Sequence, residues 1–134
     1  VRQAVADMAS GLSRTGDKAA LLRTAQAVLE KGGYDPAGGA TAYHALLEGS
    51  GNSQGISLAF ALVCQALGTE CMVVPGLLGE QPHYWTVVST PEGWRHLDLT
   101  RLDGSEDPFL VDSQMEEAGF SWDTGFVPRC RQAS

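Results

Sequence analysis

The sequence predicts an α+β domain, because its helix-like segments come first and its strand-like segments follow. The amino-terminal half carries apolar residues at helical spacing, in segments that end at glycines. After Gly68 the chain changes to short segments that are rich in β-branched and aromatic residues. Strands and helices do not alternate, so we expect helices in the N-terminal part and a central helix packed on an antiparallel sheet.

The helices are expected at five places along the chain. Asp17 can cap the helix "KAALLRTAQAVLEK", and Gly32 and Gly33 end it. The segment "QGISLAFALVCQALG" is apolar nearly all round, which is typical of a buried helix. A short helix over "QMEEAG" can be capped by Asp112 or Ser113. The expected helical segments are 4–12, 18–31, 40–49, 54–68 and 114–119.

Three consecutive strands are expected after the central helix. They are "ECMVVPGLL" (70–78), "HYWTVVST" (83–90) and "WRHLDLT" (94–100). Turn signals separate them, and "TPEG" (90–93) predicts a tight hairpin turn. The three strands therefore form antiparallel neighbours.

Composition restricts the partners that this chain can take. A net charge of −7 and a pI near 4.7 argue against nucleic acid and anionic membranes, which attract clustered Lys and Arg. No apolar run approaches the roughly 20 residues that span a bilayer, so no membrane insertion is expected. The length fits one domain, 1–134. The start at Val1 without Met suggests a module of a larger protein, with a lean towards an extracytoplasmic or cell-surface location.

The cysteines give no metal or disulfide signature. Cys64, Cys71 and Cys130 are odd in number and lack CxxC spacing, so buried free thiols are the favoured interpretation. A bridge between one pair in an oxidising compartment stays open. No metal and no organic cofactor is implied.

Three polar residues have the residue types of a catalytic triad. Ser53 starts the central helix, His83 begins a strand, and Asp98 lies on the next strand. Adjacent strands can bring His83 and Asp98 together, and the helix start can aim Ser53 at the imidazole. Taken alone the pattern is weak, because Ser53 or Asn52 can be a helix cap. His83 and Asp98 can equally be a strand-end histidine and a turn former.

The alternation of side chains adds a second expectation. His83, Trp85 and Val87 share one face of their strand, and Trp94, His96 and Asp98 share one face of theirs. If these faces coincide, two indoles flank the acid and the imidazole and could exclude water.

Three blocks in order resemble the transglutaminase-like superfamily. They are "TAYHALLEGSGNSQGISLAFALVCQALGTECMVVPG", "HYWTVV" and "GWRHLDLTRLDG", and the later "FLVDSQMEEAGFSWD" is also similar. The likeness covers roughly 41–126, and 1–40 fits the helical lead-in of such domains. It implies a papain-like layout with a nucleophile at a helix N-terminus facing a sheet that carries His and Asp.

Carried onto this chain, the family's catalytic His falls on His83, its Asp on Asp98, and its Cys on Ser53. Trp85 and Trp94 match the aromatic positions, whereas Tyr84 replaces the usual Ala. With Gln54, these three residues are the expected ligand contacts. Family chemistry is acyl transfer or amide hydrolysis through a thioester, so a peptide or protein side chain is the expected partner.

Serine at position 53 leaves three interpretations of the function. A hydroxyl ionises far less readily than a thiol, so loss of activity with retained binding is the favoured interpretation. The alternatives are a cysteine enzyme whose nucleophile was replaced by Ser in the laboratory, and a serine-type amide hydrolase that uses His83 as base. None of the three cysteines lies at the helix start to replace the missing one.

Overall fold

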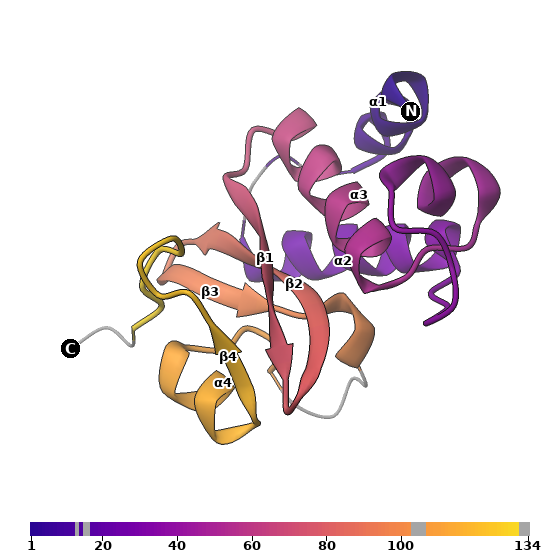
Figure 1. Cartoon of the computed structure of the whole chain (residues 1–134). Helices are drawn as coiled ribbons and strands as arrows, with labels where there is room; N and C mark the ends of the chain where they lie inside the picture. The colour runs from indigo at the N-terminus through magenta and orange to yellow at the C-terminus, as the bar shows by residue number, and fades with distance from the viewer. Residues whose placement is uncertain (13, 15–16, 103–106, 132–134) are drawn as a thin grey trace.

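An antiparallel sheet lies between the helices of the N-terminal half and a short helix near the C-terminus (Figure 1). The structure is a computed structural model that describes residues 1–12, 14, 17–102 and 107–131. Its elements are α1 (Arg2–Ser10), α2 (Lys18–Gly32), η1 (His44–Glu48), α3 (Ser53–Ala66), β1 (Cys71–Leu78), β2 (Gln81–Thr90), β3 (Gly93–Leu97), η2 (Leu99–Arg101), α4 (Asp112–Glu117) and β4 (Phe120–Trp122). The predicted α+β class is confirmed.

The ends of α2 follow the expected capping chemistry. The Asp17 carboxylate accepts a hydrogen bond from the Ala20 N–H at 2.7 Å. Gly33 has φ 51°, and its N–H donates to the Leu29 carbonyl. The expected helix 40–49 is present over 42–48, and its part His44–Glu48 is the wide π-helical turn η1. Within the described residues, the helix expected at 4–12 is α1, which begins and ends two residues earlier.

The sheet has the strand order β3-β2-β1-β4. Strands β1 and β2 pair from Cys71↔Val88 to Leu78↔Gln81, and β3 pairs with the second half of β2. Thr90 and Gly93 close the predicted "TPEG" hairpin, where the Thr90 hydroxyl donates to the Gly93 carbonyl at 2.7 Å. The fourth strand, β4, pairs antiparallel with the end of β1 and was not predicted.

Each face of the sheet covers a separate apolar core. The core on the helical side contains buried residues of α1, α2 and α3 together with Val88 and Leu97. The core on the opposite side packs Trp85 and Val87 against Met115 of α4 and Phe120 of β4. The alternation expected along β2 is therefore present. No helix in the described ranges is long and apolar enough to cross a membrane.

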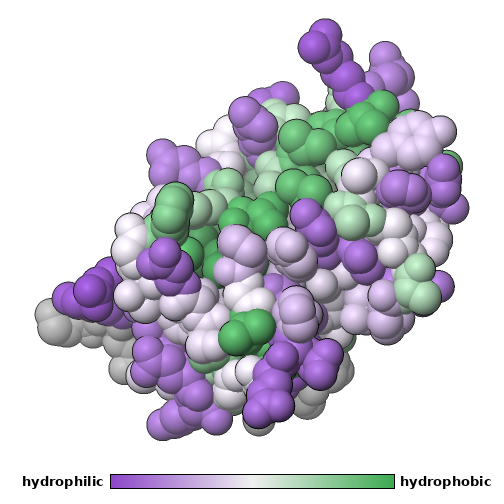
Figure 2. All heavy atoms as spheres, viewed as in Figure 1, coloured by the Kyte–Doolittle hydropathy of each residue, from purple (hydrophilic) through white to green (hydrophobic). Residues whose placement is uncertain are grey.

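Figure 2 shows hydrophilic side chains over most of the visible face, with apolar side chains gathered towards its middle. Among the described residues, the exposed large hydrophobic side chains include Tyr34, Tyr43 and Leu47, which lie in or near the loops around η1.

The pairing of β2 with β3 leaves half of one β2 edge open. The last pair in the β2–β3 ladder is Thr86↔Leu97, so the segment 81–85 has no β3 partner. The N-terminus of α3 meets β2 here, because the Tyr84 N–H bonds to Ser53. This junction between α3 and the open edge of β2 holds the three predicted triad residues.

Candidate functional site

Ser53 is the first helical residue of α3, and Asn52 is its cap. The Asn52 side chain accepts a hydrogen bond from the Gly55 N–H at 3.0 Å. The capping interpretation therefore belongs to Asn52 and is wrong for Ser53. The Ser53 Oγ instead accepts the Tyr84 N–H at 3.3 Å, from the open edge of β2. Because Asn52 does the capping, the Ser53 hydroxyl is available to the site.

His83 and Asp98 lie side by side, as the hairpin predicted. The distance between His83 Nε2 and Asp98 Oδ2 is 2.7 Å, and the two side chains are only 13% and 6% exposed. Asp98 does not lie on a strand, because β3 ends at Leu97. It caps the 3₁₀ turn η2, where its Oδ1 accepts the Thr100 N–H at 3.0 Å.

Thr100 is a member of the site that the residue-type argument missed. Its hydroxyl donates to Asp98 Oδ1 at 2.8 Å and lies 3.4 Å from His83 Nε2. Both oxygens of the Asp98 carboxylate are thus engaged, one by Thr100 and the other by His83. The Asp-x-Thr pattern was visible in the sequence and could have identified this residue.

The geometry brings Ser53 next to His83 without joining the two. His83 Nε2 is engaged by Asp98, which leaves Nδ1 as the ring nitrogen available to a nucleophile. The Ser53 Oγ bonds to the backbone of Tyr84, the residue after His83. Among the described residues, no hydrogen bond joins Ser53 to the His83 ring. Ser53 and the His83–Asp98 pair are neighbours, but among the described residues the imidazole is not hydrogen-bonded to the hydroxyl.

Aromatic rings pack against His83 on the face of the sheet opposite α1, α2 and α3. The Trp85 ring is fully buried and stacks near His83 with centroids 6.3 Å apart. Phe120 of β4 lies 6.1 Å from His83 and 5.0 Å from Trp85. One indole therefore covers the imidazole, as expected, and a phenyl ring takes the place of the second.

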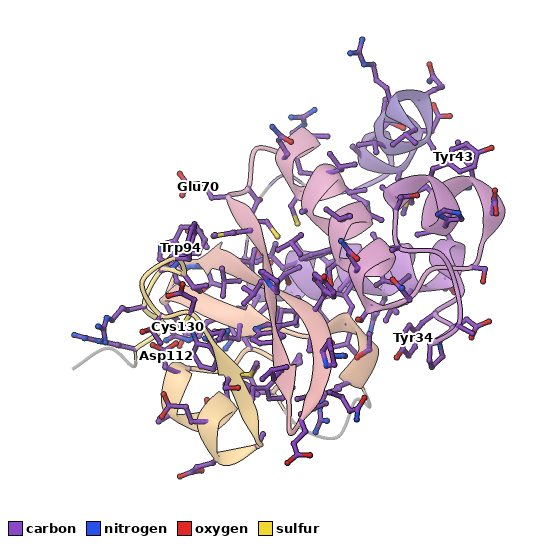
Figure 3. The ribbon with its side chains drawn as sticks, in the orientation of Figure 1. Tyr34, Tyr43, Glu70, Trp94, Asp112 and Cys130 are labelled. Carbon is purple, nitrogen blue, oxygen red and sulfur yellow. The ribbon has the colours of Figure 1, made fainter. Side chains whose placement is uncertain are left out.

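Trp94 is not part of this environment. It pairs with Ser89 near the start of β3, whereas Asp98 follows the strand's other end. It lines a groove with Cys71, and Figure 3 shows it at the same end of the sheet as Glu70. The expectation that two indoles flank the acid is wrong for Trp94. Phe120 was missed because its place depends on β4 pairing with β1, a contact between distant segments.

The remaining predicted contacts lie around the junction. Gln54 is partly exposed in the first turn of α3, and Tyr84 is half-buried on β2. Tyr34, which the sequence did not single out, is also close: burial, followed by the charges of Asp98 and Asp35, raises the pKa of its phenol. Tyr34 is 38% exposed and feels the charge of Asp98, so we place it at the rim of the site.

A cavity of about 890 Å³ lies on the other side of Asp98, between α2 and α4. Asp98, Arg101 and Phe120 are among its lining residues, and Ser53 and His83 are not. Asp98 and Phe120 are therefore residues that this cavity shares with the surroundings of His83.

A second cluster, His96, Asp112 and Cys130, has the residue types of a metal site. Their ligand atoms lie within 4.8 Å of one another (Figure 3 labels Asp112 and Cys130). However, Trp85 Nε1–H donates to His96 Nδ1 at 3.0 Å, so in the neutral ring Nε2 carries the proton. That nitrogen bonds to Asp112 at 2.7 Å, and burial raises the pKa of Cys130 to about 12. A metal bound to His96 Nε2 would leave the ring proton on Nδ1. Two N–H groups, that of Nδ1 and that of the Trp85 indole, would then face each other. The donor set therefore does not fit a metal.

The expectation that Asp112 caps α4 is wrong. Val111 occupies the cap position, and Asp112 is the first helical residue. Its carboxylate bonds to the buried His96 of β3.

The fold and the site together define a class of protein. Ser53 opens a buried helix, and a strand histidine held by a carboxylate lies beside it. This is the layout of papain-like domains, in which a side chain at a helix N-terminus faces an imidazole.

Comparisons with known proteins specify the family. A sequence profile described as the transglutaminase-like superfamily matches residues 3–99, and the chain belongs to that family. No curated protein matches. A solved structure described as a crystal structure of a TGase is similar, with a TM-score of 0.66 and 17% sequence identity. The match covers 97% of this chain and 41% of that chain, so this chain spans about two fifths of that structure. At this identity the likeness shows the fold alone.

Proposed function

We propose that this domain binds a peptide or protein side chain at the junction of α3 and β2, and that Ser53 leaves it catalytically impaired. The observation that carries the proposal is the state of the Ser53 hydroxyl. Its oxygen accepts the Tyr84 N–H, while the His83–Asp98 dyad lies beside it without engaging it. The site has the arrangement of an acyl-transfer enzyme and a nucleophile that this arrangement does not activate.

The difference between oxygen and sulfur explains the impairment. A helix N-terminus and an imidazolium lower the pKa of a thiol enough to keep a resting thiolate. The Tyr84 N–H would stabilise such an anion at position 53 in the same way. A hydroxyl needs a base to take its proton during attack, through a Ser–His hydrogen bond. That bond is missing among the described residues, so attack by Ser53 is slow.

Donors at the start of α3 support binding of a carbonyl group. Asn52 satisfies the Gly55 N–H, whereas within the described ranges the N–H groups of Ser53 and Gln54 have no acceptor. Unpaired N–H groups at the positive end of a helix attract a carbonyl oxygen. The side-chain amide of glutamine and the peptide bond both offer one. Tyr34 at the rim and Tyr84 on β2 can pack against the rest of such a ligand.

One observation favours a second candidate, an active enzyme with Cys at position 53. The dyad is fully assembled: Asp98 holds His83 at 2.7 Å, and Thr100 holds Asp98 at 2.8 Å. An intact dyad is what a thiolate at position 53 requires. In that case only the sulfur is missing, and restoring it restores acyl transfer.

The test is the reactivity of a thiol at position 53. In Ser53→Cys, alkylation by iodoacetamide is measured against pH, and peptide mapping separates the introduced thiol from the three native cysteines. An intact dyad gives rapid alkylation well below pH 8.5, the value for a free thiol. The matched control, Ser53→Cys with Asp98→Asn, keeps the shape of the site and moves the profile to higher pH. If both variants react like a free thiol, the dyad does not act on position 53 and the second candidate fails.

Activity and binding of the unaltered protein test the proposal itself. We expect no labelling of Ser53 by a fluorophosphonate and no release of ammonia from a glutamine-containing peptide. The same peptide should shift the backbone NMR signals of Ser53, Gln54 and Tyr84, and a peptide with norleucine for glutamine, which keeps only the backbone carbonyls, should shift them less. Turnover by the unaltered protein would refute the impairment, equal shifts would refute recognition of the glutamine side chain, and shifts from neither peptide would refute the binding site.

A further inference from the structure

The turn that follows α3 brings two cysteines together at the far end of the helix from Ser53. The Gly68 N–H donates to the Gln65 carbonyl, and the Thr69 N–H donates to the Cys64 carbonyl at 2.9 Å. With Gly68 at φ 80°, this is a Schellman ending that reverses the chain. Cys71 begins β1 two residues later. The backbone thus returns Cys71 to the turn of α3 that carries Cys64.

The two thiols are in contact with each other and are both reduced. Cys71 packs against the helical-side core that contains Cys64, and a thiol–thiol hydrogen bond links the pair. This bond, followed by burial, raises the pKa of the Cys64 thiol far above its ordinary range. Cys64 is completely buried, whereas Cys71 is partly exposed. A reagent in solution therefore reaches Cys71 first.

A groove gives solution access to Cys71. Its volume is about 500 Å³, and its walls include Leu58, Leu62, Trp94 and Cys71. Glu70 forms part of its rim, and Figure 3 shows Glu70 and Trp94 at this end of the sheet. The groove is lined mainly by apolar side chains, and it is large enough for a small thiol compound.

We propose that Cys64 and Cys71 are a redox modification site, which low-molecular-weight disulfides convert into an intramolecular disulfide. The Cys71 thiolate attacks one sulfur of the reagent, RSSR, which breaks the S–S bond and releases one thiolate that takes a proton from water. Cys64 then loses its proton and attacks the Cys71 sulfur, which releases the second thiolate. Two protein thiols are oxidised, and one RSSR is reduced to two RSH. Cys71 is the attacking thiol and Cys64 the resolving thiol.

The disulfide would join the end of α3 to the start of β1 without involving the triad positions. Residues 64 and 71 enclose a short loop that the Schellman turn already orders. Closing a loop constrains the unfolded chain, so the oxidised protein should melt several degrees higher than the reduced one. This effect is independent of the chemistry at Ser53.

The experiment uses the reduced, folded chain and oxidised glutathione at pH 8. After acid quenching and N-ethylmaleimide, the intact mass should show loss of two hydrogens, one alkylated thiol at most and no retained glutathione. Cleavage after glutamate separates the two cysteines, because Glu70 lies between them in the sequence. We expect one disulfide-linked pair of peptides, 49–70 with 71–80.

Single variants assign the two roles. Cys71→Ser should take up no glutathione, and Cys64→Ala should retain a glutathione adduct at Cys71. Cys130→Ala, the matched control, should form the 64–71 disulfide like the unaltered protein, because Cys130 lies in the core on the opposite face of the sheet from Cys64 and Cys71. If Cys64→Ala does not fold, the peptide map of the unaltered protein decides. A lasting adduct at Cys71, no reaction of the folded chain, or cross-linking only in urea would overturn the proposal.

Discussion

The close approach of a loop to α3 predicts that Gly55→Ala is destabilising, although alanine is the better helix former. A methyl group at position 55 would lie 2.5 Å from the Gly39 carbonyl oxygen and 2.9 Å from that of Thr41. Both are backbone atoms, so neither can rotate away. The Gly39 oxygen also accepts the Asn52 N–H at 3.0 Å, which ties this loop to the residue before Ser53.

The magnitude follows from two opposing terms. Overpacking costs about 1–3 kcal/mol, and contacts this short with backbone lie at the upper end of that range. Replacement of Gly by Ala in a helix returns at most about 1 kcal/mol. The net loss is about 1–2 kcal/mol, which lowers Tm by roughly 3–10 °C in a chain of this size. In the Ser53→Cys background, the displaced loop should also move the alkylation profile to higher pH.

Gly32→Ala is the matched control. Its new methyl group would meet Ile56 Cδ1, the end of a flexible side chain, and stand 3.4 Å from Ala45 Cβ. The Ile56 side chain can move, so the loss of stability should be smaller and position 53 should react as before. Tm from calorimetry and the alkylation profile check both variants. If Gly55→Ala is neutral, or if Gly32→Ala is the more damaging of the two, then the contact between loop and helix does not hold the site.

Three further results are expected at the site and in the core. Asn52→Ala should cost about 1 kcal/mol of stability in urea unfolding, because the cap of α3 is lost. Thr100→Val removes a hydrogen bond to the Asp98 carboxylate, so it should lower the free energy of unfolding by about 1–3 kcal/mol. In the Ser53→Cys background it should also raise the pH at which the thiol is alkylated, and an unchanged profile would contradict the positioning role of Thr100. Burial lowers the pKa of His96, despite the opposing bond to Asp112. The unfolded state then binds more protons, so the free energy of unfolding should fall as pH drops below about 6.5, and a rise between pH 6.5 and 5 would refute this linkage.

The sequence was sufficient for features that depend on local chemistry. The Asp17 cap, the Gly33 ending and the "TPEG" hairpin need only neighbouring residues, and all three are present. The register of β2 with β3 follows from the hairpin, and it brings His83 and Asp98 to 2.7 Å. That pair was therefore predictable once the turn was placed.

Features that depend on distant segments were not predictable. Phe120 lies beside His83 only because β4 pairs with β1, and three residues of strand carry too little pattern to predict that pairing. Trp94 resembled a site residue by face alternation and by its match to an aromatic position of the family. Alternation fixes the face of a strand but not the position along it, and Trp94 is at the wrong end. The early end of β3, which places Asp98 in a 3₁₀ turn, likewise depends on tertiary context.

The position of Ser53 depends on two backbone N–H groups, one on Gly55 and one on Tyr84. Asn52 takes the cap of α3, and the early end of β3 leaves the Tyr84 N–H free to face Ser53. Neither contact distinguishes oxygen from sulfur, since both atoms accept from an N–H. The geometry around position 53 is therefore compatible with either serine or cysteine. This explains how His83 and Asp98 can keep their partners in place beside a hydroxyl to which His83 is not hydrogen-bonded within the described residues.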